Sequence, residues 1–150
     1  MLVNRRVIRI EWGDCDPAGI VYFPRYFEHF DNCTVALFEK ATGLKKIAMA
    51  DENKMVGIPM VNVRARFIIP SRYGDDVAVE SRITEFRRSS FDVQHQLFRG
   101  KELAAECFET RVWTVPDRKS PGGLKSAPIP KTVRDRFIAK PRRKAAKKRA

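Results

Sequence analysis

Alternating apolar and polar residues predict a strand near the start of the chain. The alternation covers residues 6–12. Ile8, Ile10 and Trp12 alternate there with charged side chains, as in a strand with one buried face. We therefore expect these three side chains to point into the core, and the strand to end at Gly13.

The next periodic segment has the repeat of a helix. Apolar side chains recur at helical spacing from about Pro24 to Thr42, and Gly43 follows where a left-handed cap is expected. The stripe consists of Phe27, Phe30, Thr34, Leu37, Phe38 and Ala41. It is wide enough to lie against a sheet, so we predict a long helix packed on strands.

The remaining periodic segments alternate again with a period of two. Residues 44–54 lack clear periodicity and are interpreted as a connector with a short helical turn. Strands are predicted at 61–67, 77–86, 91–98 and 102–115, the last with a bulge near 107–111. One helix after the first strand, followed by antiparallel strands, predicts an α+β fold with the sheet wrapped around the helix.

The charge of the chain, +12, is concentrated at its C-terminal end. Residues 116–150 contain thirteen Lys or Arg against two Asp, so residues 1–115 carry only about +1. We predict one folded domain over 1–115. The basic tail over 116–150 contains Pro and Gly, and its composition favours disorder, with a short helix near 133–138.

The sequence gives no sign of a membrane span, a metal site or a disulfide framework. No apolar run approaches the ~20 residues of a spanning helix, and the N-terminus lacks an apolar signal core, so we expect a cytoplasmic protein. Cys15, Cys33 and Cys107 are widely spaced, and the two histidines are far apart. His95 lies in an alternating segment and is predicted to be a packing or hydrogen-bonding residue.

The candidate chemistry lies between the first strand and the helix. Asp16 precedes Pro17, which favours an extended backbone, and Gly19 can adopt positive φ. Pro24 suits the first turn of a helix, where the N–H of Phe23 lacks an intrahelical partner. Asp16 could act there as a nucleophile or water-activating base while free amides polarise a carbonyl.

A simpler interpretation of the same residues remains open. Asp14 and Asp16 are also typical of turns and helix caps, and such turns are common.

A family resemblance favours the catalytic interpretation. Residues 13–21 (GDCDPAGIV), followed by an aromatic pair, Pro24 and Tyr26, resemble the signature of hotdog-fold acyl-CoA thioesterases of the 4-hydroxybenzoyl-CoA thioesterase type. Further matching segments lie at 56–61, 73–77 and 85–91. The resemblance covers about residues 5–115. It implies the hotdog fold, an antiparallel sheet wrapped around one long central helix.

The resemblance also implies roles for individual residues. Asp16 matches the family's catalytic aspartate, and the N–H of Phe23 matches the group that polarises the thioester carbonyl. The resemblance implies no metal, flavin or nucleotide cofactor, because the thiolate of the CoA thioester substrate is a tolerable leaving group. Arg87 and Arg88 lie where relatives contact CoA phosphates, and Arg72 is a further candidate. Without the resemblance, Arg87 and Arg88 would be interpreted as solvated turn charges.

The resemblance places the acyl pocket near Gly57, Ile58 and Pro59, which a neighbouring subunit contributes in relatives. Ile58 stands where a hydroxylated side chain would suit a 4-hydroxyl substituent, which favours a less polar acyl group. Asp31 could accept a hydrogen bond from a phenol, so aryl and short aliphatic acyl groups both stay open. Because hotdog active sites form between protomers, a dimer or a dimer-of-dimers tetramer is expected.

Two other functions remain as alternatives. The chain could be an oligomeric binding protein whose basic run, residues 140–149, binds nucleic acid or another polyanion without sequence preference. Hotdog dehydratases also act on acyl thioesters, but they use a histidine and acid pair. Neither His29 nor His95 lies in a fitting motif.

Overall fold

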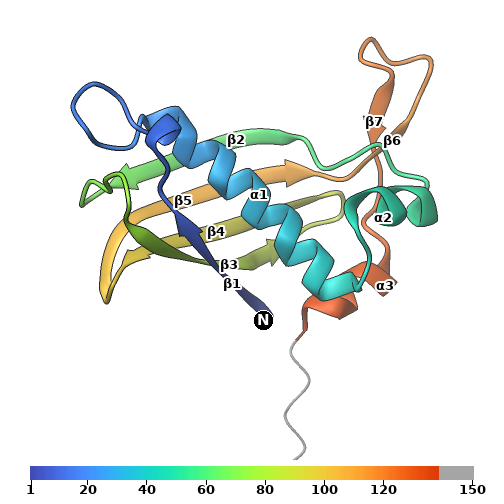
Figure 1. Ribbon diagram of the computed structural model, residues 1–150. Helices are drawn as coiled ribbons and strands as arrows, with labels where there is room; N and C mark the ends of the chain where they lie inside the picture. The colour runs from blue at the N-terminus through green and yellow to red at the C-terminus, as the bar shows by residue number, and fades with distance from the viewer. Residues whose placement is uncertain (139–150) are drawn as a thin grey trace, which may run out of the picture.

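A long helix lies across one face of an antiparallel sheet in the computed structural model, which describes residues 1–138 (Figure 1). The helices are α1 (Phe23–Thr42), α2 (Lys46–Asn53) and α3 (Lys131–Arg134), with short 3-10 turns at Trp12–Asp14 and Asp135–Phe137. The strands are β1 (Val3–Arg9), β2 (Met60–Phe67), β3 (Asp76–Phe86), β4 (Ser90–Arg99), β5 (Glu102–Val112), β6 (Thr114–Pro116) and β7 (Leu124–Ser126).

The five long strands form one sheet in the order β1-β3-β4-β5-β2. Every neighbouring pair is antiparallel. Burial alternates along β3, β4 and β5, as expected for strands with one face on the core. The predicted α+β class, an antiparallel sheet wrapped around one helix, is confirmed.

Helix α1 supplies the apolar face that the sheet covers. It begins at Phe23, with Tyr22 in the N-cap position, and ends at Gly43, whose φ of 73° only glycine adopts readily. Its buried residues are Tyr26, Phe30, Cys33, Thr34, Leu37 and Phe38. The predicted stripe is therefore confirmed at its centre. No helix within residues 1–138 is long and apolar enough to cross a membrane.

The first strand differs from its prediction at both ends. It spans Val3–Arg9, three residues earlier than expected, although Ile8 and Ile10 are buried as predicted. Trp12 was expected in the core, but its side chain is 75% exposed. The Glu11 N–H donates to the Asp14 carboxylate at 2.9 Å, and this contact turns the chain out of the strand before Trp12.

The predicted bulge lies in the opposite strand. Met60 pairs with Arg111 and Asn62 pairs with Thr110, so Val61 of β2 is the extra residue. The bulge was expected within β5, near 107–111. β5 has an extra residue at another position, because Leu97 pairs with Ala105 and Phe98 pairs with Leu103, which leaves Ala104 without a partner in β4.

The folded body extends beyond the predicted boundary at residue 115. Chain segment 116–138 was expected to be largely disordered, but Ile129, Val133 and Phe137 are buried in the core. The Leu2 N–H donates to the Phe137 carbonyl at 2.7 Å, so this segment packs beside the N-terminus. The predicted short helix corresponds to α3 and the turn after it. The basic run 140–149 lies outside the described residues.

Candidate active site

The junction between β1 and α1 is a tight hairpin. The Asp16 N–H donates to the Ile20 carbonyl at 2.9 Å, and the Tyr22 N–H donates to the Asp14 carbonyl at 2.8 Å. The turn is closed by Gly19, whose φ is 77° and whose N–H donates to the Asp16 carbonyl at 2.9 Å. The backbone of Asp16 is therefore fixed on both sides of the turn.

The carboxylate of Asp16 is held by the same turn. Its Oδ1 accepts the N–H of Ala18 at 2.8 Å, the contact that aspartate commonly makes two residues ahead. The residue is partly buried, and its Oδ2 accepts no hydrogen bond from another described residue. One carboxylate oxygen thus fixes the orientation, and the other is available for chemistry.

The hairpin leads directly into the N-terminus of α1. Phe23 is the first helical residue, and the N-cap residue Tyr22 makes no side-chain hydrogen bond to the helix. The first N–H groups of a helix lack intrahelical acceptors and carry its partial positive charge. The Phe23 N–H therefore lacks an acceptor within the helix and can donate to a group bound at this helix end.

Arg72 is the predicted CoA-binding residue that the structure brings to this hairpin. It forms a backbone bridge with Ile20, and the Val21 N–H donates to the Ser71 carbonyl at 2.9 Å. Its Nη1 would lie 3.9 Å from a Cβ at Gly19. A positive charge therefore lies beside the turn that carries Asp16.

Asp14 is a capping residue, as the simpler interpretation of the motif allowed. Its Oδ2 accepts the N–H of Glu11, and its Oδ1 lies 3.5 Å from His29 Nε2. Both side chains are more than four-fifths buried. Asp14 therefore stabilises the base of the hairpin through Glu11 and His29, whereas Asp16 lies in its turn.

A cavity of about 500 Å³ contains all four residues predicted for the acyl pocket. Asp31 comes from α1, and Gly57, Ile58 and Pro59 come from the segment before β2. Apolar side chains from α1, α2 and the segments on either side of α2 complete the wall: Val35, Phe38, Leu44, Ile47, Met49 and Met55. The connector predicted over 44–54 contributes α2 to this wall.

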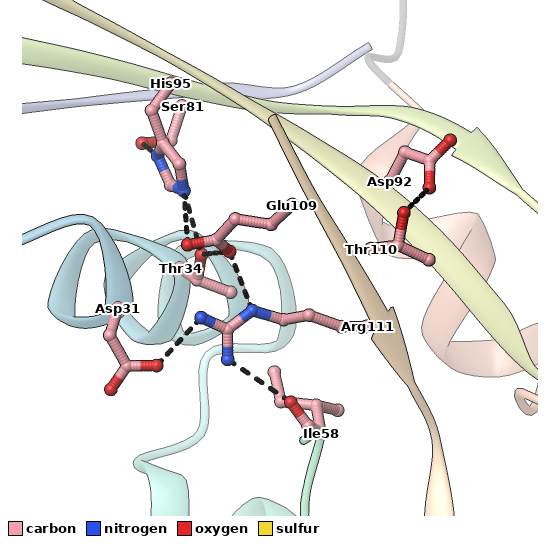
Figure 2. Close-up of polar contacts among 9 residues, drawn as sticks. All are labelled: Asp31, Thr34, Ile58, Ser81, Asp92, His95, Glu109, Thr110 and Arg111. Carbon is pink, nitrogen blue, oxygen red and sulfur yellow. Dashed lines mark hydrogen bonds and ion pairs between the residues drawn. The ribbon is translucent and has the colours of Figure 1, made fainter. Parts of the chain in front are cut away.

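Arg111 of β5 reaches the cavity from the sheet and is only 4% exposed. Its guanidinium donates to Asp31 Oδ1 at 2.8 Å, to Glu109 Oε2 at 2.7 Å and to the Ile58 carbonyl at 3.2 Å (Figure 2). Burial opposes its charge, but the two carboxylates outweigh that effect and raise the pKa of Arg111. One buried cation thus joins α1, β5 and the segment before β2.

Glu109 connects Arg111 to polar groups deeper in the core. Its Oε2 accepts the Thr34 hydroxyl at 3.0 Å, and its Oε1 lies 3.4 Å from His95 Nε2. Ser81 contacts the other ring nitrogen of His95 at 2.7 Å. Burial raises the pKa of Glu109, but His95 and Arg111 outweigh it and lower that pKa to about 2. Glu109 is therefore a carboxylate at neutral pH.

His95, Cys33 and Cys107 are buried residues of the core. His95 is fully buried and stacks on Phe30 with ring centres 5.1 Å apart, which agrees with the predicted packing and hydrogen-bonding role. Burial raises the pKa of the Cys33 thiol to about 11 and that of Cys107 to about 12. These two groups are neutral thiols at physiological pH and are poor nucleophiles. Within residues 1–138, no group of His, Cys, Asp and Glu is arranged to hold a metal.

Arg87 and Arg88 lie at the other end of β3 from Arg72. The Arg87 guanidinium pairs with Asp92, with contacts of 2.7 and 3.1 Å, whereas the Arg88 side chain is exposed. The backbone carbonyls of both residues accept hydrogen bonds from Arg134. The eleven residues of β3 span about 35 Å, so a single chain does not bring these arginines to Asp16.

Arg111, which lines the cavity, and its ion-pair partner Glu109 were missed by the sequence prediction. Both follow the alternation of β5, in which Ala105, Cys107, Glu109 and Arg111 occupy the buried positions. Thr110 between them points to the opposite face and donates to Asp92 at 2.9 Å (Figure 2). Two charges at inward positions of a strand were the available signal, because buried charges require partners.

The antiparallel sheet wrapped around one long helix, α1, defines a hotdog-fold protein. The profile of the thioesterase-like superfamily matches residues 10–137, and the chain belongs to this family. The chain is 36% identical over 114 residues to a 4-hydroxybenzoyl-CoA thioesterase from Pseudomonas sp. (strain CBS-3), covering 73% of this chain and 81% of the relative. It is 28% identical over 120 residues to a 1,4-dihydroxy-2-naphthoyl-CoA hydrolase from Gloeothece citriformis, covering 77% and 80%.

Solved structures show the same likeness. An aspartate-to-asparagine mutant of 4-hydroxybenzoyl-CoA thioesterase, in complex with 4-hydroxybenzoyl-CoA, superposes with a TM-score of 0.83 at 29% identity, covering 91% of this chain and 99% of the other. A gentisyl-coenzyme A thioesterase superposes with a TM-score of 0.74 at 26% identity, covering 89% and 98%. The resemblance to the hotdog-fold thioesterases is therefore confirmed.

Proposed function

We propose that this protein is an acyl-CoA thioesterase that hydrolyses aryl-CoA thioesters to the free acid and CoA. The observation that carries the proposal is the position of Asp16 on a fixed turn, in the hairpin that leads into the N-terminus of α1, where Tyr22 provides no side-chain cap. Membership of the thioesterase-like superfamily supports this reaction. An aspartate mutant of one relative was solved with its thioester substrate bound, which supports a catalytic role for an aspartate in such a site.

The reaction needs a nucleophile and a donor for the carbonyl oxygen. The Phe23 N–H would donate to that oxygen and stabilise the negative charge that develops on it. Asp16 would either attack the carbonyl carbon or remove a proton from the attacking water. In the first case the C–S bond breaks, CoA leaves as a thiolate and water hydrolyses the acyl anhydride. In the second case, hydroxide from water replaces the thiolate directly.

The cavity favours an aromatic acyl group. Its apolar wall suits a ring, and Asp31 offers a carboxylate that can accept a hydrogen bond from a hydroxyl. The relatives are named for 4-hydroxybenzoyl, 1,4-dihydroxy-2-naphthoyl and gentisyl thioesters. Ile58 makes the wall less polar, so a short aliphatic acyl group is the second candidate.

The site requires a second copy of the chain. Asp31 lies eight residues beyond Phe23, or about 12 Å along α1, and the arginines at 87 and 88 lie farther away. We propose that Asp16 and Phe23 of one protomer face the cavity of another, with Arg72, Arg87 and Arg88 meeting the CoA phosphates. The edge strand β2 offers unpaired backbone and the exposed Val61 and Val63 for continuing the sheet across a dimer.

A panel of thioesters tests the reaction and the acyl group. Release of CoA is followed with a thiol-trapping dye for 4-hydroxybenzoyl-CoA, a short aliphatic acyl-CoA and a long aliphatic acyl-CoA. We expect the highest kcat/KM for the aryl thioester. Faster hydrolysis of the short aliphatic thioester would reverse the choice of substrate, and release of no thiol from any of them would contradict the proposal.

Mixing two variants that each impair hydrolysis of 4-hydroxybenzoyl-CoA tests whether the site spans two protomers. Asp16→Asn and Asp31→Ala chains are unfolded together and refolded, so that hybrid dimers form. If the site spans two protomers, a hybrid has one site with both substitutions and one site with neither, and activity returns. If both residues act within one chain, every site carries one substitution, and hydrolysis does not rise above the mean of the two parent variants.

A further inference from the structure

We infer, on the basis of the proposed function, that Arg111 is a positioning residue that makes the acyl cavity specific for a hydrogen-bond donor on the acyl group. Arg111 is the buried cation at which the walls of the cavity meet. One terminal nitrogen of its guanidinium donates to Asp31 of α1, and the other donates to the Ile58 carbonyl (Figure 2). It therefore controls where the acceptor of the cavity lies.

Glu109 fixes the orientation of the Arg111 guanidinium. Glu109 accepts its Nε–H at 2.7 Å, while the two terminal nitrogens donate to Asp31 and Ile58. A guanidinium is planar, so the contact with Glu109 determines the direction in which the other donors point. The Asp31 side chain is about half exposed and would be free to rotate without this contact.

Glu109 is itself anchored in the sheet and the helix. The Thr34 hydroxyl donates to it, and Thr34 Oγ1 lies 3.1 Å from His95 Nε2. Ser81 lies at the far side of the ring, 2.7 Å from Nδ1. With a proton on Nε2, the His95 ring donates to the Thr34 hydroxyl, which in turn donates to Glu109. Hydrogen bonds thus extend from β3 to Asp31 and give its carboxylate one orientation.

The charges indicate which acyl groups this orientation favours. Glu109 balances the charge of Arg111, so Asp31 adds a negative charge to the cavity, and its Oδ2 accepts no hydrogen bond from a described residue. Glu39 and Asp51 also line the cavity, against Lys46. A neutral donor such as a hydroxyl is therefore favoured over an acyl group that ends in a carboxylate.

Two substrates that differ by one hydroxyl test this role. Steady-state kinetics are compared for 4-hydroxybenzoyl-CoA and benzoyl-CoA with the wild-type protein, Arg111→Gln and Arg111→Lys. We expect Arg111→Gln to raise KM for the hydroxylated substrate at least about 10-fold and to change kcat/KM for benzoyl-CoA by less than about 3-fold. The KM of Arg111→Lys for the hydroxylated substrate should lie between those of the wild-type protein and Arg111→Gln, because lysine keeps the positive charge but lacks the planar set of donors.

Control variants separate positioning from folding. Thr110→Val changes the neighbouring residue on the opposite face of β5 and should leave the preference for the hydroxylated substrate unchanged. If Arg111→Gln fails to fold, the Arg111→Gln/Glu109→Gln double variant removes the buried ion pair as a unit and should show the same loss of preference. An equal loss on both substrates, or an unchanged preference, would overturn the role of Arg111. Hydrolysis of neither substrate by the wild-type protein would instead overturn the proposed function.

Discussion

The backbone N–H of Phe23 can be removed without disturbing the helix start. Proline is tolerated in the first turn of a helix, and Tyr22 before it already has the extended conformation that proline requires, with φ −66° and ψ 121°. We expect Phe23→Pro to lower kcat by about 100- to 1,000-fold, because one donor to the developing oxyanion is lost. Steady-state thioester hydrolysis measures this effect.

Phe23→Ala is the matched control for the proline variant. It removes the exposed ring and keeps the N–H. We therefore expect kcat to stay within a few fold of the wild-type value. Equal activity of Phe23→Pro and Phe23→Ala would show that the amide does not polarise the carbonyl.

Glu109 makes the stability of the protein depend on acid pH. Its pKa is lowered from 4.5 to about 2, so its contribution to the free energy of unfolding is complete above pH 4.5 and is lost as the pH falls toward 2. The loss is on the order of 3 kcal/mol. Urea unfolding across this range measures it.

Variants of two glutamates test this pH dependence. Glu109→Gln should flatten the acid slope, whereas Glu85→Gln, which changes an exposed carboxylate, should keep it. An unchanged slope in Glu109→Gln would assign the acid sensitivity to other carboxylates.

The hairpin between β1 and α1 depends on the backbone of Gly19. Its φ of 77° is disfavoured for a residue with a Cβ, although a Cβ there would meet no atom closer than 3.9 Å. We expect Gly19→Ala to lower the free energy of unfolding by about 1 kcal/mol and to reduce kcat, because the turn that orients Asp16 is strained. Thermal unfolding and kinetics measure the two effects.

Gly13 provides the comparison within the same segment. Its φ lies outside the positive range, and a Cβ there meets nothing within 4 Å. Gly13→Ala should therefore leave both stability and kcat near wild-type values. If the two alanine variants behave alike, the positive φ of Gly19 is not what holds the turn.

Sequence prediction succeeded for segments in which a single hydrophobic periodicity continues without interruption. Helix α1 and its cap at Gly43 follow from a repeat of 3.6 and one glycine. Trp12 was misplaced because the hydrogen bond between Glu11 and Asp14 turns the chain before the alternation ends. Arg111 was missed as a site residue because its partners, Asp31 and Ile58, are distant in sequence.

The folded molecule includes the segment after β5, which composition alone assigned to the tail. Phe137 is fully buried, and the centre of its ring lies 4.8 Å from that of Phe38 and 5.5 Å from that of Phe86. We expect Phe137→Ala to lower the free energy of unfolding by about 3–5 kcal/mol. Urea unfolding measures the change.

The next residue is the control for this loss. Ile138 is 61% exposed, so Ile138→Ala should change stability by less than about 0.5 kcal/mol. A small effect at Phe137 would restore the predicted boundary at residue 115. The Pro and Gly residues of this segment break up any hydrophobic periodicity, so its sequence pattern predicted no element that packs on the core. Its apolar side chains are buried by contact with the rest of the core.

Hydrolysis by an Asp16→Asn variant tests the central claim for the whole molecule most directly. Asparagine keeps the size of the side chain and its contact with the Ala18 N–H, but it removes the nucleophile or base. We expect kcat for 4-hydroxybenzoyl-CoA to fall by about 100-fold or more, with the thioester still bound and Asp76→Asn, an exposed control, near wild type. Turnover by Asp16→Asn equal to that of Asp76→Asn would contradict the account.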